Sequence, residues 1–253
     1  MSLQSNIEWT DATWNPVTGC TEVSPGCDHC YAKTFAERWR GIPGHPYEQG
    51  FDIKLWPERL DLPLKWKKPR RIFTNSMSDL FHQDVPDEFI FRVFETMVKA
   101  DQHIFQLLTK RPSRLVRLSD QITNRINLLL ATTVDWPSNI WIGVSVETMQ
   151  YEWRVEKLRQ VPAAIRFISA EPLLGSLKDL NLHNIDWLIA GGESGPGHRP
   201  CDPQWVRELR NKCLQNNVSF FFKQWGGRHP KASGRELDSR TWDELPLYAS
   251  TTT

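Results

Sequence analysis

Three of the five cysteines in this 253-residue chain lie close together, in the stretch GCTEVSPGCDHCYA. Cys20, Cys27 and Cys30 form the pattern C-x6-C-x2-C, and Tyr31 follows the last of them. Cysteine thiolates bind zinc and iron–sulfur clusters, and three thiolates on a [4Fe–4S] cluster leave one iron open to a small molecule. The spacing therefore predicts a metal site, and both metals are candidates.

A structural zinc site needs four ligands, which these three cysteines do not supply. The fourth would be His29, between two of the cysteines, or the distant His198 or Cys201. An odd number of cysteines does not indicate a disulfide framework, and reduced thiols are typical of a cytoplasmic protein. Because the motif precedes a helix at the start of a β/α pattern, we favour an iron–sulfur cluster over zinc.

Short apolar segments alternate with amphipathic ones along the chain. The expected strands lie within residues 10–19, 71–79, 103–112, 140–148, 165–175, 185–195 and 218–227. The expected helices lie within residues 31–41, 87–100, 113–130, 151–161 and 202–217. The strands are continuously apolar, as in a parallel sheet that helices cover. The pattern predicts an α/β fold, a partial β/α barrel of about six to seven mostly parallel strands with outer helices.

No sharp domain boundary interrupts this pattern, so we expect residues 1–253 to form a single domain. Residues 42–69, rich in Pro, Gly and Trp, are interpreted as an insertion, and a polar C-terminal tail begins at about residue 227. The first residues do not form a signal peptide, and the apolar runs are too short to cross a membrane. We therefore expect a cytoplasmic protein with no membrane partner.

Polar side chains stand at the ends of the expected strands. In β/α barrels these ends converge on one mouth, where active sites lie, so their convergence argues for an enzyme. The candidates are Asn75, Ser76, Asp79, Lys110, Arg111, Ser145, Glu147, Glu171, Gly191, Gly192, Glu193 and Lys223. The G-x-G-x-x-G, P-loop, Ser-His-Asp and His-Glu-x-x-His patterns are not found, which argues against the enzyme classes that use them.

The cysteine loop resembles the cluster loop of radical S-adenosylmethionine (SAM) enzymes. Its GCDHCYA segment is most similar to the spore-photoproduct-lyase-like branch, in which Tyr-Ala also follows the last cysteine. Nearly the whole chain also resembles an uncharacterised phage-associated family at the margin of that superfamily. The segments IEWTDATWNPVTGC, FTNSMSDLFH and GGESG carry this second resemblance.

The resemblance implies that Cys20, Cys27 and Cys30 ligate a [4Fe–4S] cluster whose open iron is chelated by SAM. One electron, from a donor such as flavodoxin or ferredoxin, would cleave SAM to a radical that abstracts hydrogen from substrate. The resemblance also implies contacts to SAM from successive strand ends. These come from Asn75 and Ser76 to the amino group, from Ser145 and Glu147 to the ribose, and from Glu171, Gly191 and Gly192 on the adenine side.

Four residues are candidates for catalysis, each with a plainer alternative. Lys110, with Arg111, grips a phosphate or occupies a strand-to-helix turn. Glu193 acts on the substrate or is a solvated acid. Cys201, in the loop GHRPCD, donates hydrogen to a radical or is a partly buried thiol. Lys223, at the end of FFFK, binds a substrate anion or pairs with an acid.

The substrate is expected to be a nucleic acid or a modified nucleobase. The net charge of +1 creates no global field for nucleic acid, so a local patch is needed. The basic run KWKKPRR, residues 65–71, has Trp56 and Trp66 nearby, and the chain holds twelve tryptophans. The alternative is a zinc-bound, non-catalytic barrel module that binds nucleic acid or a partner.

Overall fold

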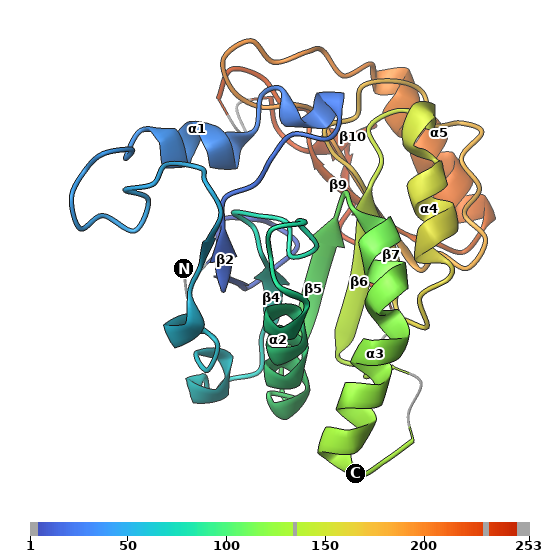
Figure 1. Ribbon diagram of the computed structural model, residues 1–253. Coiled ribbons are helices and arrows are strands. Elements are labelled where there is room, and N and C mark those ends of the chain that lie inside the picture. Colours follow the sequence, from blue (N-terminus) through green and yellow to red (C-terminus); the bar gives the residue numbers. More distant parts are fainter. Residues whose placement is uncertain (1–4, 134–135, 230–232, 247–253) are drawn as a thin grey trace.

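The computed structural model describes residues 5–133, 136–229 and 233–246. Its centre is a seven-stranded sheet in which every neighbouring pair is parallel, in the order β1-β4-β5-β6-β7-β8-β9. The strands are β1 Ala12–Trp14, β4 Arg71–Thr74, β5 Ile104–Thr109, β6 Ile140–Ser145, β7 Arg166–Ala170, β8 Trp187–Gly191 and β9 Ser219–Gln224. The sheet curls into a half-barrel with helices around it (Figure 1), which confirms the predicted α/β partial barrel.

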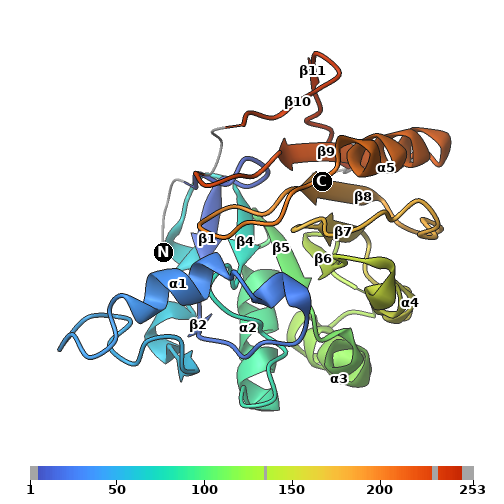
Figure 2. The same ribbon diagram turned by 90° about the horizontal axis from the view of Figure 1, so that it is seen from above.

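Helices connect most of the strands and cover the outer face of the curled sheet (Figure 2). The covering helices are α2 Asp87–Lys99, α3 Pro112–Leu130, α4 Trp153–Leu158 and α5 Pro203–Gln215, whereas α1 Tyr31–Glu37 lies on the carboxyl-end side of the sheet. Helix α2 buries Ile90, Val93, Phe94 and Met97, so its apolar stripe faces the sheet. All five helices fall within the ranges predicted from the sequence or begin one residue earlier.

The inner face of the half-barrel is filled with aromatic side chains. Trp187 of β8 lies at its centre, with its ring centroid 5.6 Å from that of Phe167 and 6.1 Å from that of Trp141. Trp9, from the chain before β1, packs 6.0 Å from the same indole. Six of the twelve tryptophans are buried in the described chain, so much of the tryptophan content serves packing.

Two small antiparallel sheets accompany the main one. Strand β2, Val17–Thr18, pairs with β3, Lys54–Leu55, and so ties the start of the cysteine loop to the segment expected as an insertion. Strands β10 and β11, Glu236–Leu237 and Arg240–Thr241, form a hairpin near the C-terminus. Among the described helices, none is both long and apolar enough to cross a membrane.

Gly143 of β6 provides a test of inner-face packing. A Cβ added there would lie 2.4–2.5 Å from the ring of Phe167, a contact that forces buried side chains to shift. Gly143→Ala should lower the free energy of unfolding in urea by about 1–3 kcal/mol. Gly175→Ala, whose Cβ would approach Thr148 no closer than 3.6 Å, is the matched control and should change it little. Equal effects of the two substitutions would contradict this packing.

Candidate functional site

The cysteine loop, residues 19–30, lies over the carboxyl ends of the strands and leads directly into α1 (Figure 1). It starts at Gly19, whose φ of 90° and whose closeness to the Asp52 carbonyl, 2.2 Å from an added Cβ, leave room for glycine alone. The amide N–H of Gly19 donates to the Met77 carbonyl, and that of Cys20 donates to the Phe51 carbonyl. Backbone hydrogen bonds alone therefore fix the position of the Cys20 main chain.

All three loop thiols line one pocket of about 280 Å³, together with Thr21, Glu22, Lys33 and Phe51. Each of these cysteines is free and partly exposed. Within the described residues, no group of three or more His, Cys, Asp or Glu side chains is placed to hold a single metal ion. In a [4Fe–4S] cluster each thiolate bonds a different iron, so the sulfurs need not converge on one point. Three free thiols around one hollow fit such a cluster.

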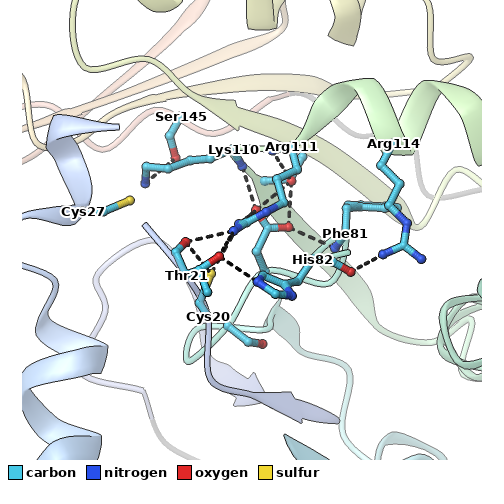
Figure 3. A network of polar contacts seen from close by, with 12 residues as sticks. Cys20, Thr21, Cys27, Phe81, His82, Lys110, Arg111, Arg114 and Ser145 are labelled. Carbon is cyan, nitrogen blue, oxygen red and sulfur yellow. Dashed lines mark hydrogen bonds and ion pairs between the residues drawn. The ribbon is translucent and has the colours of Figure 1, made fainter. Parts of the chain in front are cut away.

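Arg111, two residues beyond β5 and directly before α3, joins the cysteine loop to the sheet (Figure 3). Its Nη1 donates to Cys20 Sγ at 3.3 Å and to Asp79 Oδ2 at 3.2 Å. Its Nη2 donates to the carbonyl and to Oγ1 of Thr21, at 2.8 Å and 3.0 Å. Burial and the nearby Asp79 carboxylate raise the pKa of Cys20 to about 11, against the opposing effect of Arg111. The metal-free residue is therefore a neutral thiol, and a metal must displace its proton.

Glu147, two residues beyond β6, anchors the middle of the loop. It is fully buried and accepts from Ser24 Oγ at 2.7 Å and from Arg154 Nη1 at 2.9 Å. A Cβ on Gly26 would lie 2.5 Å from the Glu147 carboxylate, so glycine lets the loop approach closely. Lys110 Nζ lies 3.6 Å from the same carboxylate and donates to Ser145 Oγ. The structure thus brings three predicted site residues, Lys110, Ser145 and Glu147, together beneath the loop.

Glu193, two residues beyond β8, anchors the last part of the loop. Its side chain is 5% exposed and accepts from His29 Nδ1 at 2.9 Å and from Arg199 Nη2 at 2.6 Å. Arg199 also donates to Asp28 Oδ2 and to the carbonyl of Pro25. Burial works to raise the pKa of Glu193, but the bonds from Arg199 and His29 outweigh it and hold the pKa at about 2. The carboxylate therefore stays charged at neutral pH.

Glu171 and Lys223 form an ion pair apart from these anchors. Glu171 follows β7 and Lys223 lies in β9, and the two meet across β8, over Gly191. Gly192 lies against the Trp225 carbonyl and close to Cys201, which is partly buried and whose pKa is raised to about 11 by burial.

Asn75 and Ser76 lie in the turn that follows β4. Asn75 adopts a left-handed φ of 63°, a conformation that asparagine tolerates better than most residues. The Tyr31 hydroxyl, at the start of α1, donates to the carbonyl of Ser76 at 2.6 Å. This contact joins the helix after the last cysteine to the second predicted strand end.

Several residues that shape the site were not among the sequence candidates. Arg154 lies on the buried face of α4 with Val155 and Leu158, a position where the sequence pattern favours an apolar residue, and it is 1% exposed. Ser24, Thr21 and Arg199 lie in loops, where sequence spacing carries no sign of their partners. The sequence signal that could have pointed to these partners was the set of acids at the strand ends, since a buried carboxylate requires a paired cation.

Fold and loop together define a half-barrel of parallel strands with a three-cysteine pocket at its carboxyl edge. The chain belongs to the family described as "Protein of unknown function (DUF5131)", whose model matches residues 4–246. No curated protein matches the chain at a significant level.

Solved structures of spore photoproduct lyase are similar to the chain. One, complexed with dinucleoside spore photoproduct, shows 12% identity and a TM-score of 0.49, and the match covers 79% of this chain and 59% of that chain. A cysteine-to-serine mutant shows 14% identity and a TM-score of 0.49, over 80% of this chain and 61% of that chain. A mutant with bound AdoMet and dinucleoside spore photoproduct shows 13% identity and a TM-score of 0.48, with coverage of 80% and 61%. The matched part is thus about three fifths of the length of these structures.

Because the pKa of Glu193 is depressed, we expect the contribution of this carboxylate to the free energy of unfolding to depend on pH. Glu193→Gln should lower the unfolding free energy near pH 7 by roughly 2–3 kcal/mol, because it replaces a buried charged partner of Arg199. The pKa is depressed from 4.5 to about 2, so this stabilisation is full above about pH 5 and is lost as the pH falls towards 2. Urea unfolding of the metal-free protein at several pH values measures it.

The difference in unfolding free energy between the parent and Glu193→Gln should therefore become smaller as the pH falls from about 5 towards 2. Glu22→Gln, at an exposed pair with Lys33, is the control and should change the unfolding free energy by less than about 0.5 kcal/mol. A gap that stays constant between about pH 7 and pH 2.5 would show that the charge of Glu193 is not what stabilises the loop.

Proposed function

We propose that the protein is a radical SAM-like enzyme whose Cys20, Cys27 and Cys30 hold a [4Fe–4S] cluster. The observation that carries the proposal is the convergence of three free thiols from one loop on a single pocket at the carboxyl edge of a parallel sheet. When bound, a cluster with one iron free of protein ligands supplies both a chelation site for SAM and the electron for its reductive cleavage. We propose a flavodoxin or ferredoxin as the source of that electron.

The residues of the chain hold and shield this site. Arg111, Glu147 and Glu193 each fix a different part of the loop through hydrogen bonds to its side chains or backbone. Fixed thiols lose little conformational freedom on binding, which favours loading of the cluster. We assign Glu193 a positioning role, because its carboxylate is fully engaged by Arg199 and His29.

SAM would lie along the strand ends beneath the loop. We propose contacts from residues that the sequence already indicates: Asn75, Ser76, Ser145, Glu171, Gly191 and Gly192. We assign Glu147 a positioning role, because its buried carboxylate is already engaged by Ser24 and Arg154. Lys110 is held at the rim by Ser145 and Glu147, which places a cation where the carboxyl ends of β5 and β6 meet. Lys223 and Cys201 remain candidates for contact with substrate on the β8–β9 side.

We propose a nucleic acid or a modified nucleobase as the substrate. Exposed aromatic side chains beside the pocket support this: Tyr31 and Phe35, four residues apart in α1, are 58% and 44% exposed. Such rings stack on unpaired bases. Trp39 is 37% exposed, but its ring already stacks on that of His45, with centroids 4.1 Å apart. The Trp56 ring is already covered by the Lys54 and Arg59 cations, at 4.0 Å and 3.5 Å from its centroid.

Anaerobic reconstitution with iron and sulfide tests the metal assignment. The parent should become brown, contain about four irons per chain, and give a reduced-state EPR signal that changes when SAM is added. Cys27→Ala should lose the cluster, whereas Cys213→Ala, at a buried cysteine of α5, should keep it. A colourless protein that binds zinc, takes up no iron and shows no spectral change with SAM would instead support the non-catalytic zinc-bound module.

The aromatic face of α1 predicts a defined loss of nucleic-acid affinity. Phe35→Ala should weaken binding of a single-stranded oligonucleotide by roughly 5- to 150-fold, because one stacked base contributes about 1–3 kcal/mol. Fluorescence anisotropy at fixed salt measures the Kd. Leu214→Ala, at an exposed apolar side chain of α5, is the control and should leave the Kd unchanged. Equal Kd values for the parent and both variants would show that Phe35 of α1 does not contact the oligonucleotide.

A further inference from the structure

The contact between Arg111 and Cys20 places a fixed positive charge on one of the three loop thiols. Arg111 Nη1 lies 3.3 Å from the sulfur, and the Arg111 side chain is 15% exposed. Figure 3 shows the guanidinium between the Cys20–Thr21 backbone and the strand ends. A charge so close to the sulfur and so little screened by water acts strongly on any group that the sulfur binds.

The hydrogen bonds of Arg111 leave it little freedom to serve another ligand. Its two terminal nitrogens carry four N–H groups, and four acceptors surround them: Cys20 Sγ, Asp79 Oδ2, and the carbonyl and hydroxyl oxygens of Thr21. The planar guanidinium matches this fork of acceptors, which the ammonium of a lysine cannot do. Of the two roles that the sequence leaves open for Arg111, a grip on phosphate is therefore disfavoured.

Asp79 holds the guanidinium from the other side. Its carboxylate is 8% exposed and accepts from the Thr109 hydroxyl and from the backbone N–H groups of Phe81 and Lys110. These bonds orient the carboxylate towards Arg111, so the cation cannot swing away from Cys20 without leaving a buried charge unpaired.

Thr21 is held in turn by a buried histidine. His82 Nδ1 accepts from the backbone N–H of Asp84 at 3.2 Å, which places the ring proton on Nε2. That nitrogen lies 2.8 Å from Thr21 Oγ1 and donates to it. The hydroxyl that Arg111 contacts is thus fixed from a third direction, and the arrangement around Cys20 is set without a metal.

We propose that Arg111, oriented by Asp79, is a positioning residue that raises the reduction potential of a cluster bound through Cys20. The inference rests on the proposed function. A hydrogen bond to a ligand sulfur and a nearby cation both stabilise the reduced, more negative state of a cluster. Asp79 opposes the effect through its own charge while it keeps Arg111 in place.

Redox titration of the reconstituted protein, followed by EPR, tests this inference. Arg111→Met should shift the midpoint potential to more negative values, because it removes both the N–H···S bond and the charge. Arg111→Lys keeps the charge without the fork and should lie between Arg111→Met and the parent. Arg117→Met, at an arginine of α3 that is 58% exposed, is the control and should match the parent.

Asp79→Asn supplies a signature that a merely structural role cannot produce. The isosteric amide keeps a side-chain oxygen that accepts from Arg111, so the guanidinium stays beside Cys20 while a negative charge is removed. The midpoint potential should therefore shift to less negative values, opposite to Arg111→Met. Shifts in the same direction, or a potential in Arg111→Met equal to that of the parent at equal iron content, would overturn the inference. If Arg111→Met fails to hold a cluster, Arg111→Lys and Asp79→Asn decide the question by the same signs.

Iron content separates this inference from the function on which it rests. A parent that takes up no iron contradicts the proposed function, and the inference with it, before any potential is measured. If the parent binds about four irons but neither Arg111→Met nor Asp79→Asn changes the midpoint potential, only the inference is contradicted.

Discussion

Three buried carboxylates hold the cysteine loop in place, and they follow alternate strands of the sheet. Asp79 comes after β4, Glu147 after β6 and Glu193 after β8. A buried carboxylate is tolerated only when it is paired with a positive charge, and each of these three forms an ion pair with an arginine guanidinium. The pairs are Asp79–Arg111, Glu147–Arg154 and Glu193–Arg199. Each pair or its carboxylate contacts a different part of the loop, so the positions of the thiols depend on the parallel order of the strands.

This arrangement explains why a loop with few apolar side chains keeps a defined shape. Its glycines permit close approach, at Gly19 to the Asp52 backbone and at Gly26 to the Glu147 carboxylate. The ion pairs lie at the rim, where the aromatic packing of the inner face ends. Rigid strands below and charged anchors above thus order the pocket, which lowers the entropic cost of binding a cluster.

Sequence patterns predicted the fold well because strand and helix periodicity depends on burial, which this sheet satisfies throughout. The strand ends were also found, since the polar residues that follow each apolar run are visible in one dimension. The partners of those residues were not found: Arg154 shares the buried face of α4 with Val155 and Leu158, where a charged residue is not expected, and Arg199 lies in a loop. Both arginines are close in sequence to their carboxylates, seven and six residues away, but the side-chain directions that bring each pair together depend on the turns after β6 and β8, which strand and helix periodicity does not encode.

The central claim is that the three thiols hold a cluster with one iron open to SAM. Mössbauer spectra of protein reconstituted with ⁵⁷Fe, with and without SAM, test it most directly. The account predicts that one of the irons changes its isomer shift when SAM is added while the others do not. Spectra unchanged by SAM, or a site that takes up only a single metal ion, would contradict it.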